Sequence, residues 1–323
     1  MTLKDGAGRN INYLRLSITD RCNLRCTYCM PEEGFELCGV SDILSLEEFA
    51  LACEKLSRLF GINKIRLTGG EPLIKRNVEF LIEKLASNPG INDLAMTTNG
   101  ALLAEKGQKI YDAGLRRLNV SIDTLNPDRF KTLTRFGKLE DSIDGINLAK
   151  KIGFSPIKIN TVLLPGFDEE AEIIEWGNSE GFVVRFIELM QGQPTSIDAL
   201  TGIAPQMPDL ISRLEKKFGS VENVADNSTD PGKHTVKFRI PSKDWNFEII
   251  PAITNHFCNH CNRIRLNCKG DLRFCLYSEQ TKNIRGLLRK SDEEFMDGIV
   301  NFVNDKISRG SDHIASYMYS IGG

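Results

Sequence analysis

The first two thirds of the chain alternate short β-rich runs with stretches in which apolar residues recur at helical spacing. This alternation predicts βα units and a parallel sheet. A capping box at residues 45–48, Ser-Leu-Glu-Glu, predicts a helix that runs to about Phe60. Glycine suits the left-handed conformation that stops a helix, and four predicted helices end in one: Gly61, Gly114, Gly153 and Gly181. The predicted strands are residues 13–19, 64–68, 94–98, 117–122, 157–164 and 183–189.

About six βα units are too few for a closed eight-stranded barrel, so we predict an α/β fold with an open, partial TIM-like (β/α)6 barrel. The carboxyl ends of its strands should converge on the functional site. After Met190 the pattern is less regular, and we place a boundary near residue 200: a partial barrel in residues 1–200 and a C-terminal region in 201–323. The elements predicted in the second part are linkers or turns at 191–204 and 223–233, a helix at 207–218, and a strand pair at 235–240 and 247–250.

Composition adds limits on the function. The 323 residues are 41% hydrophobic and 26% charged, which is ordinary for a soluble globular protein. A formal net charge of -2 argues against nucleic acid as a partner, so any polyanionic ligand would need a local cluster of arginine and lysine. A polar N-terminus and no long apolar stretch argue against secretion and membrane insertion. Nine cysteines then indicate reduced, metal-binding thiols in a cytoplasmic protein.

Three of these cysteines, Cys22, Cys26 and Cys29, lie directly after the first predicted strand. Thiolates at this C-x3-C-x2-C spacing can hold three irons of a cubane iron–sulfur cluster and leave the fourth iron open to another ligand. Structural zinc is the alternative, but it needs four protein ligands, and the nearest further cysteine is Cys38 in a loop. The spacing therefore favours the open cluster.

A second group, Cys258, Cys261 and Cys275, has C-x2-C-x13-C spacing. From spacing alone, zinc completed by His260, His256 or Cys268 is about as plausible as a second iron–sulfur cluster. We interpret Cys268 as a free thiol in a turn, Cys38 as a loop thiol and Cys53 as a helix-packing residue.

Two further patterns carry polar chemistry. Residues 69–72, Gly-Gly-Glu-Pro, form a strand-ending turn that lacks the lysine and the length of a phosphate-binding loop. Basic residues alternate with apolar neighbours on the predicted strands and should share one face of the sheet. They are Arg15, Lys64, Arg66 and Lys158. Such a face is either solvated or a phosphate site.

The cysteine triplet after a first strand and the Gly-Gly-Glu-Pro turn after a second resemble the radical S-adenosylmethionine superfamily. Within it, the chain is similar to the GTP 3',8-cyclase family of molybdenum cofactor biosynthesis. The matching segments are residues 14–21, the Cys-Met-Pro at 29–31, the Asn-Arg-Ile-Arg at 262–265 after Cys261, and the terminal Gly322-Gly323. The resemblance covers nearly the whole chain.

The resemblance implies two 4Fe-4S clusters and S-adenosylmethionine as cofactors. Each cysteine group would hold one cluster, and the S-adenosylmethionine site would be lined by Tyr28, Gly70, Ser121 and Met190. GTP would be bound by Arg15, Arg66, Thr97, Lys158, Arg263, Ile264 and Arg265, with Arg263 and Arg265 also acting in catalysis. The terminal Gly-Gly would reach into the site. Gln191 departs from the family, in which a proline usually follows the methionine.

The implied reaction removes hydrogen from the ribose 3' carbon of GTP and joins that carbon to guanine C8, giving 3',8-cyclo-7,8-dihydroguanosine 5'-triphosphate. The implied partners are GTP, an electron donor, cyclic pyranopterin monophosphate synthase as the next enzyme, and a second copy in a homodimer. Two alternatives remain at this point. One is a radical enzyme with an auxiliary cluster that modifies a peptide, and the other is a non-enzymatic zinc-binding or redox-sensing protein.

Overall fold

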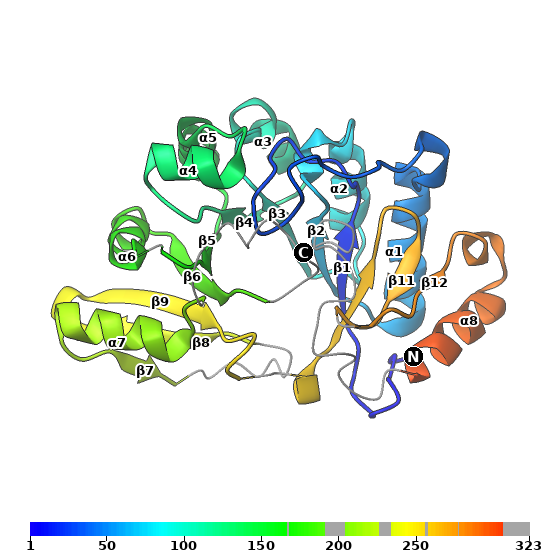
Figure 1. The fold of residues 1–323 in the computed structure, drawn as a ribbon. Helices are drawn as coiled ribbons and strands as arrows, with labels where there is room; N and C mark the ends of the chain where they lie inside the picture. Colours follow the sequence, from blue (N-terminus) through cyan, green and yellow to red (C-terminus); the bar gives the residue numbers. More distant parts are fainter. Residues whose placement is uncertain (167, 191–203, 226–233, 256–257, 277, 306–323) are drawn as a thin grey trace.

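One continuous sheet organises the computed structural model, which describes residues 1–166, 168–190, 204–225, 234–255, 258–276 and 278–305. Its strand order is β12-β11-β10-β1-β2-β3-β4-β5-β6-β9-β8-β7 (Figure 1). The first six strands are β1 Tyr13–Ser17, β2 Lys64–Thr68, β3 Asp93–Thr98, β4 Arg117–Ser121, β5 Ile157–Leu163 and β6 Val183–Glu188. The others are β7 Glu222–Val224, β8 Val236–Ile240, β9 Trp245–Ile250, β10 Arg263–Leu266, β11 Asp271–Arg273 and β12 Lys282–Asn283.

Strands β1 to β6 pair in parallel, and each is followed by helices that cover one face of the sheet (Figure 1). The helices are α1 Leu46–Phe60, α2 Val78–Ala86, α3 Leu103–Asp112, α4 Pro127–Thr134, α5 Leu139–Ile152, α6 Glu170–Ser179, α7 Met207–Phe218 and α8 Asp292–Asn304. In the described part of the chain, none of them has the length and apolar character that crossing a membrane requires.

The local signals in the sequence act as predicted. The Ser45 side chain accepts from the Glu48 amide while the Glu48 carboxylate accepts from the Ser45 amide, so the predicted capping box opens α1. All four helix-ending glycines have a positive φ, between 72° at Gly61 and 109° at Gly153, which a side chain would strain. The predicted helix at 207–218 matches α7.

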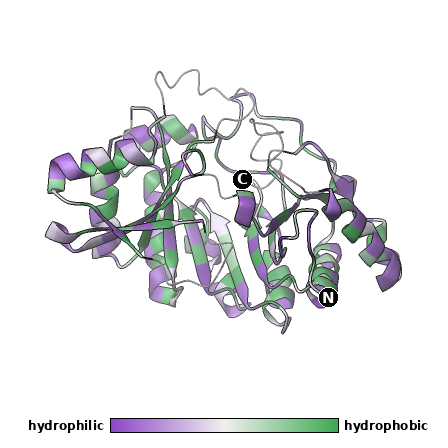
Figure 2. Ribbon diagram, turned by 90° about the horizontal axis from the view of Figure 1, so that it is seen from below, coloured by the Kyte–Doolittle hydropathy of each residue, from purple (hydrophilic) through white to green (hydrophobic). Residues whose placement is uncertain are grey.

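The two faces of the parallel strands differ in chemistry. In β1 and β2, Leu14, Leu16, Ile65 and Leu67 are fully buried against the helices, and the residues between them are only half-buried. Figure 2 shows polar and apolar residues alternating along the central strands. Because successive side chains on a strand point to opposite faces, the basic residues all reach the face without helices.

The sheet is open, as predicted, but it is longer than six strands. Strand β10 pairs in parallel with β1, and β9 pairs in parallel with β6, so the second part of the chain extends both edges of the partial barrel. A smaller apolar core formed by α6, α7, β6, β8 and β9 also draws on both sides of residue 200. The sequence did not indicate this continuity.

Candidate active site

A single cavity of about 530 Å³ lies on the helix-free face of the sheet, and all six cysteines of the two groups line it. Cys22, Cys26 and Cys29 follow the carboxyl end of β1, whereas Cys258 and Cys261 precede the amino end of β10. Cys275 follows β11, which runs antiparallel to β10 and therefore ends beside Cys261. Since β10 is parallel to β1, the two groups occupy opposite ends of the strands. A five-residue strand separates such ends by roughly 16 Å.

Backbone hydrogen bonds position the first cysteine group. The Cys26 carbonyl accepts from the amides of Cys29 at 2.9 Å and Met30 at 3.0 Å, which curls the loop so that its cysteines face the cavity. The amides of Arg25 and Thr27 donate to the last carbonyls of α4, both at 3.0 Å. The loop is thus held by neighbouring main chain.

The Gly-Gly-Glu-Pro turn packs against this loop. A Cβ on Gly70 would lie 2.2 Å from the Arg21 carbonyl oxygen, and one on Gly69 would lie 2.7 Å from that of Thr19. The Gly70 amide donates to Thr19 at 2.9 Å and the Glu71 amide donates to Arg21 at 2.8 Å. The glycines are therefore required by contact with the cysteine loop, a role that the sequence alone did not show.

Glu71 connects the turn to the end of β3. Its buried carboxylate accepts from the Thr98 hydroxyl at 2.8 Å, the Asn99 amide at 2.8 Å and the Leu73 amide at 2.9 Å. Burial raises the pKa of Glu71 to about 7, while these donors act in the opposite direction. The carboxylate holds the turn and the end of β3 together beside the first cysteine group.

The residues predicted to bind S-adenosylmethionine lie at this same end of the cavity: Tyr28, Gly70, Ser121 and Met190. The Tyr28 hydroxyl donates to Asp123 at 2.8 Å, and the other Asp123 oxygen accepts from the Val162 amide at 2.8 Å. Burial raises the pKa of Asp123 to about 6. Asp123 was not among the predicted site residues, although its place directly after β4 was a signal for it.

Side-chain and main-chain hydrogen bonds together hold the second cysteine group. The Asn262 side chain donates to the Asn12 side chain at 2.7 Å. The main-chain carbonyl of Asn262 accepts from the main-chain amides of Asn12 and Tyr13, both at 3.2 Å. The Arg9 guanidinium donates to the Cys258 carbonyl. These contacts join the loop before β10 to the chain that enters β1. The predicted zinc ligand His256 lies outside the described residues, and His260 is on the 3-10 turn Cys258–His260.

Between the two cysteine groups, arginines form a row across three adjacent strands. In the sheet register Arg265 of β10 faces Arg15 of β1, which in turn faces Arg66 of β2. Arg263 and Arg66 each lie over the Tyr13 ring, 5.1 and 5.4 Å from its centre. Ile264, predicted with them, is fully buried in the opposite, helix-facing core, so it can offer only main-chain groups to the cavity.

Polar partners orient the remaining cations. Lys158 Nζ lies 3.1 Å from Glu248 Oε2, and Arg66 Nη2 lies 2.8 Å from Asp93 Oδ2. Arg185 donates to the Asn160 side-chain oxygen at 2.8 and 3.0 Å and to that of Asn119 at 3.0 Å. Thr97, a predicted GTP ligand, lines the cavity near Asn119.

The cavity is strongly cationic although the chain carries a net charge of -2. Nine arginine and lysine residues line it against four carboxylates, counted over the described residues. Burial lowers the pKa of Arg265 to about 9, and the nearby Arg15 and Arg263 act in the same direction. Burial also lowers the pKa of Arg185 to about 10. Grouping these charges is unfavourable without an anion, so the site fits a polyanion.

Sequence reasoning missed several of these polar groups. Arg185 and Arg117 alternate with apolar residues on β6 and β4, the same signal that identified Arg15 and Arg66. Arg9 precedes β1 and had no strand pattern to mark it. Glu248 lies on β9, and nothing in the sequence indicated that β9 would pair beside β6.

The three other cysteines lie away from the cavity. Cys53 is fully buried in α1, as predicted. Cys268 lies in the turn between β10 and β11, close to Cys38, and does not face the second cysteine group. It is therefore not placed to close that group.

The donor chemistry at both ends fits iron–sulfur clusters. Each end offers three soft sulfur ligands to open cavity space, as a cluster with one uncommitted iron requires. Burial raises the pKa of Cys22 to about 11, and burial together with Cys29 and Asp123 raises the pKa of Cys26. Ionised thiols so placed need a cationic group among them.

Comparisons with known proteins agree with this geometry. Residues 16–177 match the model of the Radical SAM superfamily, and residues 182–311 match that of Molybdenum Cofactor Synthesis C. Among solved structures, SuiB of Streptococcus suis bound to S-adenosylmethionine has a TM-score of 0.64 at 13% identity, covering 90% of this chain and 67% of that one. The structure titled "Native anSMEcpe with bound AdoMet" has a TM-score of 0.58 at 14% identity, covering 91% and 84%. At this identity the likeness shows the fold, which is that of a radical S-adenosylmethionine protein.

Sequence relatives are more specific. The GTP 3',8-cyclase of Peptoclostridium acidaminophilum is 40% identical over 326 residues, covering 99% of this chain and 98% of that protein. That of Desulforamulus reducens is 42% identical over 290 residues, covering 88% and 87%. The chain belongs to the GTP 3',8-cyclase family. Its cofactors are accordingly S-adenosylmethionine and iron–sulfur clusters.

Proposed function

We propose that this protein is the enzyme that converts GTP to 3',8-cyclo-7,8-dihydroguanosine 5'-triphosphate, the first step of molybdenum cofactor biosynthesis. One observation carries the proposal. A single cavity has a three-cysteine group at each end and a row of arginines between them. A nucleoside triphosphate bound in this cavity can approach both cysteine groups at once.

The cysteine groups have separate tasks in this proposal. Cys22, Cys26 and Cys29 hold the first 4Fe-4S cluster, and Tyr28, Gly70, Ser121 and Met190 surround S-adenosylmethionine beside it. When bound, these two cofactors supply the radical chemistry that removes hydrogen from ribose C3'. Cys258, Cys261 and Cys275 hold the second cluster at the guanine end.

The basic residues bind and orient GTP. Arg15, Arg66, Thr97 and Lys158 would hold the triphosphate, and Arg185, half-buried near Lys158, extends the same surface. A planar guanidinium can contact two phosphate oxygens at once. Arg263, the Ile264 main chain and Arg265 lie next to the second cysteine group and would position the base. Holding C3' and C8 in reacting geometry is the protein's main contribution.

The proposal also covers the domain division, the chain terminus, the partners and the location. It includes the division into residues 1–200 and 201–323, the entry of Gly322 and Gly323 into the site, an electron donor, a homodimer, and cyclic pyranopterin monophosphate synthase as the next enzyme. The terminal glycines and Gln191 lie outside the described residues. A cytoplasmic location is supported by the nine cysteines of the chain, six of them in two groups with metal-ligand spacing.

An anaerobic incubation with S-adenosylmethionine, a reductant and GTP deuterated at C3' tests the function. We expect a cyclised nucleotide of the same composition as GTP, and deuterium in the 5'-deoxyadenosine that is released. GTP with deuterium at C8 is the matched control and should transfer none. Cleavage of S-adenosylmethionine without any cyclised nucleotide, or deuterium transfer from C8, would contradict the proposal.

A further inference from the structure

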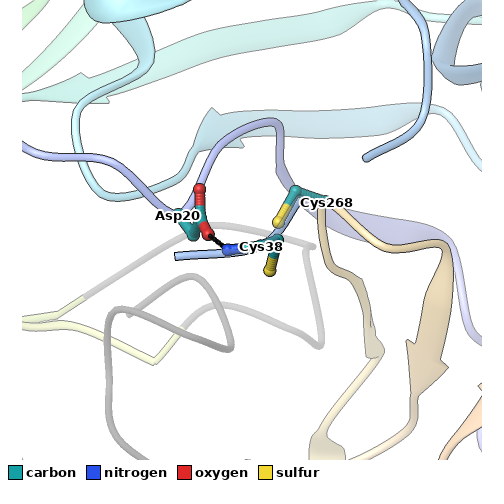
Figure 3. Close-up of side chains that lie close together, drawn as sticks. All are labelled: Asp20, Cys38 and Cys268. Atoms are coloured by element: carbon teal, nitrogen blue, oxygen red, sulfur yellow. Dashed lines mark hydrogen bonds between the residues drawn. The ribbon is translucent and has the colours of Figure 1, made fainter. Parts of the chain in front are cut away.

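Three potential metal ligands gather outside the cavity. The side-chain ligand atoms of Asp20, Cys38 and Cys268 all lie within 4.8 Å of one another. Figure 3 shows Cys268 directed from its turn toward Asp20 and Cys38. None of the three lines the cavity described above. The cluster is therefore separate from both cysteine groups.

Main-chain contacts preorganise this cluster. The Cys38 amide donates to Asp20 Oδ2 at 2.7 Å, which fixes the carboxylate, and the Leu44 amide donates to the Cys268 carbonyl at 2.8 Å (Figure 3 shows the first). Asp20 is only 5% exposed and Cys268 only 4%. Their side chains therefore have little freedom to turn toward water.

The second oxygen of the Asp20 carboxylate is Oδ1. It is buried and has no hydrogen-bond partner among the described residues. A buried carboxylate oxygen without a partner is unfavourable, because its lost hydration is not replaced. A cation bound to this carboxylate and to the two sulfurs would compensate for that cost.

The surrounding charges suit a divalent cation. Two thiolates and one carboxylate with a divalent cation leave one net negative charge. Lys269 faces Cys38, and Lys75 faces Cys268 and Asp20, so two ammonium groups can offset that charge. Thiolate ligands favour zinc over magnesium or calcium, which prefer oxygen alone.

We propose that the Asp20 carboxylate, Cys38 Sγ and Cys268 Sγ bind one zinc ion, with water at the fourth position. The ion joins three segments: the chain leading into Cys22, the loop between Cys29 and α1, and the turn between β10 and β11. It thereby fixes the first cysteine loop to the strand that carries Arg263 and Arg265. The site does not depend on the nucleotide proposed above.

Metal analysis tests the site. The full chain is purified anaerobically with its clusters intact, mixed with zinc, and passed through a desalting column before its metals are measured. We expect about one zinc per chain beside the cluster iron in the wild type. Cys38→Ala and Cys268→Ala should each lose that zinc and keep their iron. Cys53→Ala, which removes a buried thiol in α1, is the matched control and should keep both metals.

Zinc X-ray absorption of the wild type tests the ligands without any substitution. Two sulfurs at about 2.3 Å and two oxygens at about 2.0–2.2 Å are expected. No retained zinc, zinc retained by both variants, or a shell of three or four sulfurs would overturn the proposal. So would a Cys38–Cys268 disulfide in the anaerobic wild type, because that bond consumes both sulfur ligands.

Discussion

The two ends of the cavity hold three cysteines each, but they are built differently. The first end rests on main-chain hydrogen bonds among β1, the Gly70 turn and α4, with Glu71 beneath them. The second end adds side-chain hydrogen bonds from Asn262 and Arg9 to the main-chain bonds of Asn262 and to the pairing of β10 with β1. The first end is therefore part of the βα framework, whereas the second end is joined to that framework by the pairing of β10 with β1. Changes at the first end should affect every activity, and changes at the second should affect GTP alone.

The largest effect is expected for Cys22→Ser, because it removes one of three ligands at the framework end. Both S-adenosylmethionine cleavage and GTP cyclisation should fall to background, with about half of the iron lost. Cys53→Ser is the control: it replaces a cysteine outside the cavity and should keep both activities. If Cys22→Ser keeps cleavage at the wild-type rate, the first cysteine group is not the site of that reaction.

Arg263→Ala should distinguish the roles of the two ends of the cavity most clearly. Cyclisation should fall by about 100-fold because GTP is no longer positioned, while S-adenosylmethionine cleavage in the absence of GTP persists. Arg239→Ala is the control, since Arg239 is half-exposed on β8 and pairs with Asp244. Equal loss of both activities in Arg263→Ala would show that the ends are not independent.

Gly70→Ala tests the main-chain support of the first end. The new methyl group would meet the Arg21 carbonyl, and overpacking of this kind costs about 1–3 kcal/mol. The denaturation midpoint should drop, and both activities should decrease together. Gly286→Ala is the matched control, because that site is open and has an ordinary φ of -64°, so its midpoint should be unchanged or slightly higher. Equal midpoints for the two variants would contradict the close contact.

Asn262→Ala should have the smallest effect of the four and should be confined to the second end. It leaves Asn12 without its 2.7 Å side-chain partner, a cost of about 1–3 kcal/mol in unfolding free energy. We expect a several-fold higher KM for GTP and unchanged S-adenosylmethionine cleavage without GTP. An unchanged KM would mean that Asn262 does not position β10.

Local signals predicted most of the framework. The strand at 64–68 has the predicted bounds, and the other five differ by one or two residues. These elements were predictable because capping, glycine stops and alternation act over a few residues. The same alternation correctly placed Arg15, Arg66 and Lys158 on one face.

Long-range contacts could not be predicted in the same way. The partners of the cavity cations, Glu248 for Lys158 and Asn119 for Arg185, come from strands distant in sequence. The reason for glycine at position 70 is the Arg21 carbonyl, which no local pattern marks. Cys38 and Cys268 are 230 residues apart, and each alone looked like an unused thiol.

The sequence by itself determined which residues alternate across the strands and where the helices start and stop. It also determined that two incomplete sets of thiol ligands exist. Each of these properties depends on residues that are close together along the chain. Only the tertiary structure decided that β10 lies beside β1. That pairing places the two cysteine groups at opposite ends of one cavity and aligns Arg265, Arg15 and Arg66 between them. Strand pairing depends on which edges can bury apolar surface and complete their hydrogen bonds in the folded molecule, and this is a property of the whole chain.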